Sequence, residues 1–243
     1  ISKCYAITQY DRILQFASLS FDVSVFEIFC TFYNSAAICI IEENAKKDPI
    51  QIAQFIDQHQ VTLAELPPVL LPLLKPHITL FKSIRLLSLG GEKFHMQHVL
   101  PWLSTSRQVI NGYGPTETTV AVTTYPCHHQ YESTPAIGKP LDNVEVYVLG
   151  KSGNLLPVGA LGELHVGGPF LADGYLNKKE LTDKVFIQYT LDGSKPIRLY
   201  NTGDICRWRG DGNLEIFGSV DRQKKIRGLR VEPAEIEKCA LIL

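Results

Sequence analysis

The 243 residues include 24 Lys and Arg against 25 Asp and Glu, and 45% of them are hydrophobic. This near balance creates no basic field for nucleic acid or an anionic membrane, and no apolar stretch approaches the roughly 20 residues that span a bilayer. The six cysteines form no C-x-x-C pair, which argues against a zinc site and favours free thiols in a reducing, cytoplasmic setting. Because the chain opens on Ile1 and ends on an apolar run, we expect a fragment of a longer protein, truncated at both ends.

Short buried strands alternate with helices in the first part of the chain. Apolar runs predict strands at residues 13–19, 36–41, 61–66 and 84–89. Apolar stripes predict one helix around residues 25–29 and another over 52–59, the latter entered through Asp48 and Pro49. This alternation favours a largely parallel sheet covered by helices, and we expect such a partial α/β subdomain over residues 1–125.

After about residue 125 the apolar period changes from 3.6 to 2. Val144, Val146 and Val148 alternate with other side chains, as do Leu164 and Val166. The turn sequence GDGN at residues 210–213 lies between two strand-like segments and predicts a hairpin. We therefore expect an antiparallel β subdomain over residues 126–217, followed by a basic stretch and the start of a helix.

The segment NGYGPTETT, residues 111–119, carries the most chemistry. Its glycines let backbone N–H groups approach an anion closely, and its threonine hydroxyls can donate to phosphate oxygens. Glu117 can hold a hard cation such as Mg²⁺, and Tyr113 offers a flat face to a purine. These residues alone leave two interpretations open, a ligand site and a polar turn that follows a strand.

Five ordered motifs resemble those of the adenylation domains of nonribosomal peptide synthetases, which belong to the adenylate-forming superfamily with acyl-CoA synthetases and luciferases. They are FDVS at 21–24, NGYGPTE at 111–117, GEL to GYL at 162–176, YNTGD at 200–204, and the run 218–237. The resemblance covers nearly the whole chain. It implies part of the large N-terminal domain of that fold, an α/β layer followed by an antiparallel β subdomain. Residues 218–243 would then be the hinge and the beginning of a truncated C-terminal lid.

The resemblance also implies a nucleotide site. Tyr113 would stack on adenine, and Asp204 would accept hydrogen bonds from both ribose hydroxyls. Thr116 at the α-phosphate and Glu117 at Mg²⁺ would be the catalytic residues, and Asp221 would be the hinge. The implied nucleotide-binding residues are Gly91, Glu92, Asn111, Gly112, Tyr113, Asp204 and Arg230. Two plainer alternatives stay open: Asp204 as a turn residue, and Glu92 as a charge at a helix N-terminus.

The implied activity uses ATP and Mg²⁺ to activate an amino acid as an aminoacyl-adenylate. The acyl group then passes to phosphopantetheine on a peptidyl carrier protein, and a condensation domain is a further partner that the resemblance allows. The family's phosphate loop and lid lysine fall outside the chain, so we expect these 243 residues alone to be inactive.

Three residues depart from the family's pattern: Asn201, Ile216 and Ser219. These departures keep open the alternative that the chain is a non-catalytic nucleotide-binding module. The enzyme alternatives are an acyl- or aryl-CoA ligase and a D-alanine carrier-protein ligase of the same superfamily.

The resemblance further implies a pocket for the substrate side chain, lined by Asp22, Val23, Phe26, Glu65, Leu87, Leu89, Gly112, Val120 and Ala121. Asp22 would pair with the α-ammonium of an amino acid, although an Asp in front of a helix is also a common N-cap. Glu65 stands among apolar neighbours, and a buried carboxylate requires a cationic partner. A basic substrate such as ornithine or lysine would supply that partner. The alternative is that Glu65 faces solvent and the pocket takes an aliphatic side chain.

Overall fold

The computed structural model describes residues 1–104, 106–128, 134–191, 193–220, 224–226 and 229–231. The chain divides into two compact units, Ile1–Tyr113 with Thr124–Pro135 and Gly114–Thr123 with Ala136–Leu243. Asp221 and the expected helix after residue 233 lie outside the described residues. The division of the chain at residues 125 and 217, with residues 218–243 as hinge and lid, stays a prediction.

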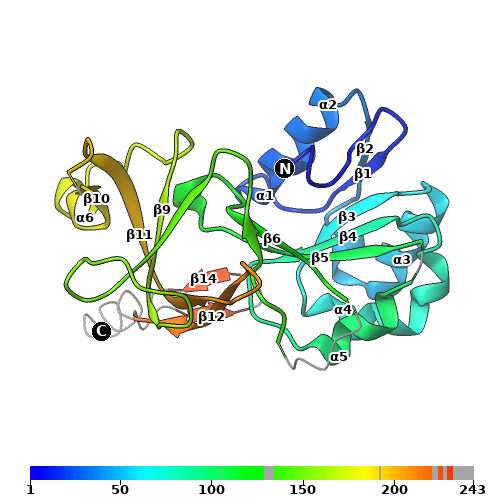
Figure 1. Cartoon of the computed structure of the whole chain (residues 1–243). Coiled ribbons are helices and arrows are strands. Elements are labelled where there is room, and N and C mark those ends of the chain that lie inside the picture. Colours follow the sequence, from blue (N-terminus) through cyan, green and yellow to red (C-terminus); the bar gives the residue numbers. More distant parts are fainter. Residues whose placement is uncertain (105, 129–133, 192, 221–223, 227–228, 232–243) are drawn as a thin grey trace, which may run out of the picture. The chain divides into compact units, whose positions relative to one another are not determined.

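A parallel sheet forms the centre of the first unit (Figure 1). Its strands run in the order β2-β1-β3-β4-β5-β6, and the first five are parallel. Their bounds are β1 (Arg12–Gln15), β2 (Ala37–Ile40), β3 (Leu63–Leu66), β4 (Leu86–Gly90), β5 (Gln108–Tyr113) and β6 (Thr123–Pro126). The four strands expected from apolar runs are present, as β1, β2, β3 and β4.

Helices connect these strands. The first connection is a helix of three parts, α1 (Val23–Val25), the π-helical turn η1 (Phe26–Cys30) and α2 (Thr31–Tyr33). The others are η2 (Ala45–Lys47), α3 (Pro49–Gln58), α4 (Leu70–Leu74), η3 (Lys75–Leu80), α5 (Met96–Val99) and η4 (Leu100–Trp102). Helix α3 begins as expected, because the Asp48 side chain accepts a hydrogen bond from the Ile50 N–H. It buries Ile52 and Ile56 completely, so its apolar stripe covers the sheet.

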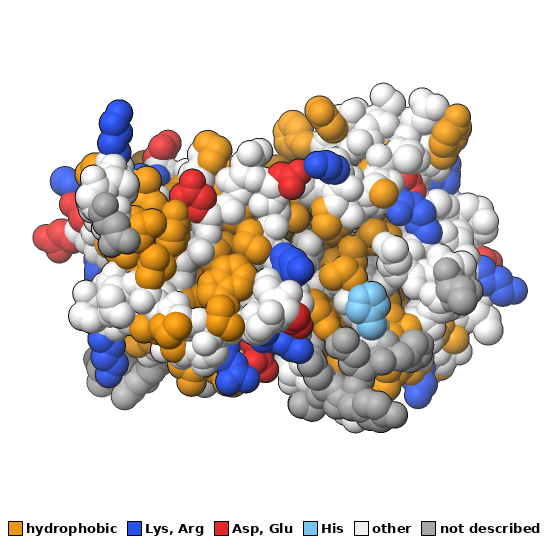
Figure 2. Space-filling model, viewed as in Figure 1, with side chains coloured by type: hydrophobic (Ala, Val, Ile, Leu, Met, Phe, Trp, Pro, Cys, Tyr) orange, Lys and Arg blue, Asp and Glu red, His pale blue; other side chains and the backbone are white. Residues whose placement is uncertain are grey.

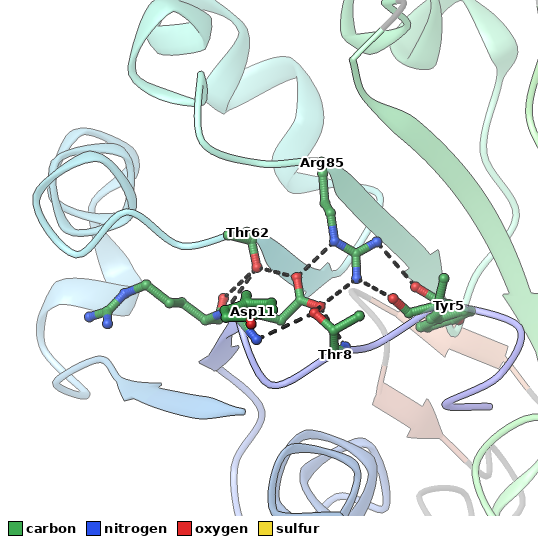
Figure 3. A network of polar contacts seen from close by, with 8 residues as sticks. Tyr5, Thr8, Asp11, Thr62 and Arg85 are labelled. Atoms are coloured by element: carbon green, nitrogen blue, oxygen red, sulfur yellow. Dashed lines mark hydrogen bonds and ion pairs between the residues drawn. The ribbon is translucent and has the colours of Figure 1, made fainter. Parts of the chain in front are cut away.

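An ion pair at the N-terminal ends of the strands holds the first unit together (Figure 3). Asp11, directly before β1, is 3% exposed. Both its carboxylate oxygens lie 2.7 Å from Arg85 nitrogens, and it also accepts hydrogen bonds from the Thr62 hydroxyl and the Thr8 N–H. Arg85 in turn donates to the Tyr5 carbonyl at 3.2 Å. The network therefore fixes the loop that carries Tyr5.

An antiparallel sheet forms the second unit. Strands β10 (Phe186–Tyr189), β11 (Ile197–Trp208), β9 (Gly162–Gly167) and β8 (Glu145–Leu149) pair in that order, and β12 (Leu214–Ser219) also pairs with β11. The unit also contains η5 (Thr116–Thr118), β7 (Lys139–Pro140), α6 (Lys179–Val185), and the hairpin of β13 (Lys224–Ile226) and β14 (Leu229–Val231). The expected hairpin is β11–β12, with Gly212 at φ +78° in its turn. The predicted fold class, an α/β layer followed by an antiparallel β subdomain, is confirmed.

The surface carries charges of both signs. On the face drawn in Figure 2, Lys and Arg side chains are interspersed with Asp and Glu. Within the described part of the chain, no helix combines the length and apolar character needed to cross a bilayer.

Candidate active site

One face of the parallel sheet brings polar side chains together in the first unit. Glu65 on β3 is the register partner of Ser88 on β4, and Gly90 on β4 is the partner of Gly112 on β5. Register partners point to the same side of a sheet, and successive residues point to opposite sides. Glu65, Ser88, Gly90 and Gly112 therefore share one face, and Gly90 lies next to the Glu65 carboxylate.

The same alternation separates the predicted pocket residues into two sets. Leu87 and Leu89 flank Ser88 on β4, so they point to the opposite face of the sheet from Glu65 and Gly112. Both are completely buried there. Their part in the pocket stays a prediction, and the β4 residues on the Glu65 face are Ser88 and Gly90. A two-residue period in the sequence defines these two sets but does not say which of them faces a ligand.

A buried hydrogen bond connects Tyr5 with the face of the sheet that carries Glu65. The Tyr5 hydroxyl lies 2.8 Å from the Ser88 hydroxyl, and both residues are buried. Ser88 is the register partner of Glu65, so its side chain lies on the same face as that carboxylate. Tyr5 was missing from the predicted site because nothing in the local sequence connects it with residue 88.

Burial sets the protonation of Glu65. The pKa of its carboxyl is raised to about 7, mainly by desolvation and to a smaller extent by the negative charges of Glu27 and Asp22, while Ser88 opposes the shift. No Lys, Arg or His within the described ranges forms an ion pair with Glu65. A carboxylate in this setting favours a cationic ligand, because a positive charge would offset its desolvation.

The helix that follows β1 supplies the other pocket residues of the first unit. Asp22 takes the N-cap position of α1, yet its side chain makes no capping hydrogen bond. The plainer N-cap interpretation of Asp22 therefore has no support in the geometry. Phe26 is 3% exposed and packs edge-on against Tyr5 with 5.4 Å between ring centroids. Val23 precedes it on the same helix and is half-buried. The π-helical turn begins at Phe26, and such turns are frequent at functional sites.

Five predicted nucleotide-binding residues lie where β4 and β5 end, Gly112 among them. Asn111 and Tyr113 occupy β5 and are 7% and 8% exposed. Gly91 follows β4 at φ +85°, a conformation that favours glycine. Glu92 accepts a hydrogen bond from the Val69 N–H at 3.3 Å, at the N-cap of α4, which supports its interpretation as a charge at a helix N-terminus.

The second unit carries the predicted catalytic residues on a strained turn. Thr116 is exposed and Glu117 is 6% exposed, both in η5. Thr119 and Val120 follow at φ +57° and +69°, which costs about 1–3 kcal/mol for each such residue. Gly114 permits this path, since a Cβ there would lie 2.4 Å from the Val120 carbonyl oxygen. The turn continues into Ala121, which is half-buried like Val120.

The segment around Asp204 contains two of the residues that depart from the family's pattern. The Asn201 side-chain oxygen accepts a hydrogen bond from the Gly203 N–H at 2.9 Å, and the Ser219 hydroxyl donates to the Gly203 carbonyl at 3.1 Å. Gly203 has φ +70° and precedes Asp204, whose register partner is Ser219. Asn201 and Ser219 therefore order the irregular part of β11 that presents Asp204, a local structural role that their residue types did not indicate.

The predicted site is divided between the two units. Asn111 and Tyr113 belong to the first unit, whereas Glu117 and Asp204 belong to the second. Their meeting in one cleft stays a prediction. Arg230 lies in β14, and the hinge residue Asp221 falls outside the described residues.

Comparison with known proteins agrees with these features. The model of a family described as AMP-binding enzyme matches residues 1–176. Zwittermicin A synthase ZmaJ of Bacillus cereus is 37% identical over 254 residues, which cover 99% of this chain and 48% of the relative. Gramicidin S synthase 1 of Brevibacillus brevis is 40% identical over 97% of this chain and 21% of its own. The chain thus spans less than half the length of these relatives.

Solved structures give the same result. PA1221, a nonribosomal peptide synthetase protein containing adenylation and PCP domains, has a TM-score of 0.89 and 28% identity, over 97% of this chain and 48% of that one. The Vibrio cholerae adenylation domain AlmE, in complex with glycyl-adenosine-5'-phosphate, has a TM-score of 0.86 and 33% identity, over 98% of this chain and 45% of that one. The chain belongs to the AMP-binding enzyme family and, within it, is similar to the adenylation domains of nonribosomal peptide synthetases.

Proposed function

We propose that the chain forms part of an adenylation domain that activates an amino acid with ATP and loads it onto a phosphopantetheine carrier protein. In the activation step, a carboxylate oxygen of the amino acid forms a bond to the α-phosphorus of ATP. The bond from that phosphorus to the leaving oxygen breaks, and pyrophosphate departs. The observation that carries the proposal is the pair of carboxylates near one another in the first unit, Asp22 and Glu65, because an amino acid with a basic side chain has two cationic groups to match.

The nucleotide would be bound by the residues that the family resemblance implies. Tyr113 would stack on adenine beside Asn111, Gly112 and Gly91, and Asp204 would accept hydrogen bonds from the ribose. Thr116, exposed on its turn, would contact the α-phosphate. Glu92 and Arg230 would lie nearby, and Asp221 would be the pivot for the lid. The similarity to AlmE, solved in complex with glycyl-adenosine-5'-phosphate, supports this assignment.

Glu117 would hold Mg²⁺ together with phosphate oxygens of the nucleotide. Within the described residues, no three His, Cys, Asp or Glu side chains form a group that could hold a metal ion by themselves. A lone carboxylate fits Mg²⁺, which is usually bound through one or two carboxylates plus substrate phosphates. When bound, the ion would neutralise charge that develops on the phosphates.

The substrate is proposed to be an amino acid with a basic side chain, such as ornithine or lysine. Its α-ammonium would pair with Asp22, its methylenes would pass Phe26 and Val23, and its terminal ammonium would meet Glu65. Val120 and Ala121 would complete the pocket from the second unit.

The proposed partners are the amino acid, a peptidyl carrier protein and, in a larger assembly, a condensation domain. PA1221, with its adenylation and PCP domains, supports the carrier protein as partner. We propose a cytoplasmic enzyme without nucleic-acid or membrane partners.

Amino-acid-dependent pyrophosphate exchange tests the proposal in an enzyme that carries this chain within a complete adenylation domain. Basic amino acids should support exchange and leucine should not. Glu65→Gln should reduce kcat/KM for the basic substrate about 100-fold, because it removes a charge-assisted contact worth about 1.5–3 kcal/mol. The matched control is Glu180→Gln, an exposed carboxylate on α6 in the other unit.

Other results of the pyrophosphate-exchange assay would indicate a different substrate or a different function. Exchange with leucine alone would place Glu65 outside the pocket. Exchange with D-alanine, or acid-dependent exchange with fatty or aryl acids, would indicate one of the related ligases. Nucleotide binding without any exchange would indicate a non-catalytic module.

A further inference from the structure

We infer that Tyr175 is a positioning residue that orients the Glu117 carboxylate toward the nucleotide and its metal ion. The inference rests on the proposed function. The Tyr175 hydroxyl donates a hydrogen bond of 2.5 Å to Glu117 Oε1, across 58 positions of the chain. One such bond fixes the rotation of the carboxylate plane, so that its remaining lone pairs have a defined direction.

The backbone before Tyr175 also holds the turn that carries Glu117. The Ala172 N–H donates to the Glu117 carbonyl at 2.9 Å. The Thr119 hydroxyl donates to the Phe170 carbonyl at 2.7 Å. Residues 170–175 therefore contact η5 and its C-cap at three points, and we call this segment the clamp.

The clamp is itself fixed to the antiparallel sheet. Arg198 on β11 donates to the carbonyls of Ala172 and Asp173, both at 2.8 Å. Its guanidinium lies 4.4 Å from the ring centroid of Phe186. Arg198 is thus held by Phe186 and in turn holds two carbonyls of the clamp. The clamp therefore has little freedom to shift, and it can fix the position of the turn.

The end of the clamp is fixed by helix α6. The Tyr175 N–H donates to the Thr182 hydroxyl at 2.9 Å, and Gly174 has φ +146°. A Cβ on Gly174 would lie 2.3 Å from Thr182 Cγ2, so only glycine allows this approach. The Tyr175 ring also meets Phe186 edge-on at 6.1 Å between centroids. The backbone of Tyr175 is thus fixed by Thr182 and its ring by Phe186. These two contacts define where its hydroxyl lies relative to Glu117.

The strained turn explains why such a clamp is required. Thr119 and Val120 both have positive φ, a conformation that persists only where surrounding contacts enforce it. Without the clamp the turn would relax, and the Glu117 side chain would lose its direction. A carboxylate that is to bind a metal ion and phosphates in one geometry gains affinity from being held in advance.

The test compares Tyr175→Phe with wild type in an enzyme carrying this chain within a complete adenylation domain. The variant keeps the ring and loses only the hydroxyl. The Mg²⁺ concentration for half-maximal pyrophosphate exchange should rise about 5- to 10-fold, while KM for the amino acid changes less than twofold. Mn²⁺ binding in the presence of a non-hydrolysable ATP analogue, followed by electron paramagnetic resonance, should weaken by a similar factor.

Two further variants separate positioning from folding. Tyr147→Phe removes a hydroxyl that donates to Glu145 at 3.0 Å in the same unit, and it should leave the metal dependence unchanged. In a Glu117→Gln background, Tyr175→Phe should add no further weakening of Mn²⁺ binding. An unchanged Mn²⁺ affinity in Tyr175→Phe, or equal loss in both backgrounds, would overturn the inference. Absence of amino-acid-dependent exchange in the wild type would instead contradict the proposed function, and the Mn²⁺ measurement would still report on Tyr175.

Discussion

The two units place their candidate residues by different means. In the first unit, Glu65, Ser88 and Gly112 occupy regular parallel strands, so alternation and register decide where they point. In the second unit, Glu117 lies on a strained turn whose position depends on contacts with a segment more than 50 residues away. A regular strand tolerates changes that keep its pattern, whereas the turn depends on a few individual atoms.

The largest expected effect would test the frame of the first unit. Asp11→Ala should lower the free energy of unfolding by about 3–5 kcal/mol, because it leaves the Arg85 guanidinium without its buried partner. Burial alone would raise the pKa of Asp11, but hydrogen bonds from Arg85, Thr62 and Thr8 bring it down to about 2. The stabilisation is therefore present above the ordinary Asp pKa and is lost as the pH falls through about 2. Urea denaturation of the 243-residue chain would measure both.

The matched control for this prediction is an exposed ion pair of the second unit. Lys179 and Asp183 pair at 2.6 Å with side chains 85% and 61% exposed. Asp183→Ala should cost no more than about 0.5 kcal/mol, as is usual for such helical pairs. A loss for Asp11→Ala as small as that for Asp183→Ala would contradict the role of the network.

The next effect would test the turn of the second unit. Gly114→Ala should cost about 1–3 kcal/mol, because the new methyl group would overlap backbone atoms of Val120 and Ala121. Gly218→Ala is the control, since a Cβ there would meet nothing within 4 Å. Thermal denaturation of the chain would compare them. Equal stability of the two variants would show that the turn can adopt another path.

The smallest effect would test the electrostatics of the pocket. Desolvation raises the pKa of the Glu65 carboxyl to about 7, so the group is ionised above this pH and neutral below it. KM for a basic amino acid should therefore rise about tenfold between about pH 8 and pH 6. The assay is pyrophosphate exchange in the enzyme with the complete adenylation domain. Glu65→Gln should give a flat profile, and a wild-type profile that is equally flat would exclude Glu65 as the partner of the substrate ammonium.

Much of the first unit was predictable because its signals are local. Asp48 and Pro49 mark the start of α3, and apolar runs mark the first four strands. The side of the sheet was not predictable, because both residue sets on β4 contain leucine. Leu86 and Ser88 share one face while Leu87 and Leu89 share the other. Only the register with β3 and β5 distinguishes them.

The second unit shows the opposite balance. Its hairpin at residues 210–213 follows from turn chemistry. The bond between Tyr175 and Glu117 has no local signal, since it joins residues 58 positions apart. Asn201 and Ser219 were noticed only as departures from a family pattern, and their contacts with Gly203 became visible in three dimensions.

Under the proposed pocket, the two glycines on the Glu65 face would make the length and the charge of the accepted side chain separately adjustable. A methyl group on Gly112 would meet its nearest atom at 3.6 Å, an ordinary contact, whereas one on Gly90 would crowd the Gly112 carbonyl at 3.1 Å and Glu65 at 3.3 Å. Under the proposed pocket, Gly112→Ala would shorten the accepted chain while leaving the carboxylate in place. Exchanges at Glu65 would instead alter the preferred charge at constant volume. Single substitutions at these positions would then change the preferred amino-acid substrate to one of similar length or charge, and the sheet itself would stay the same.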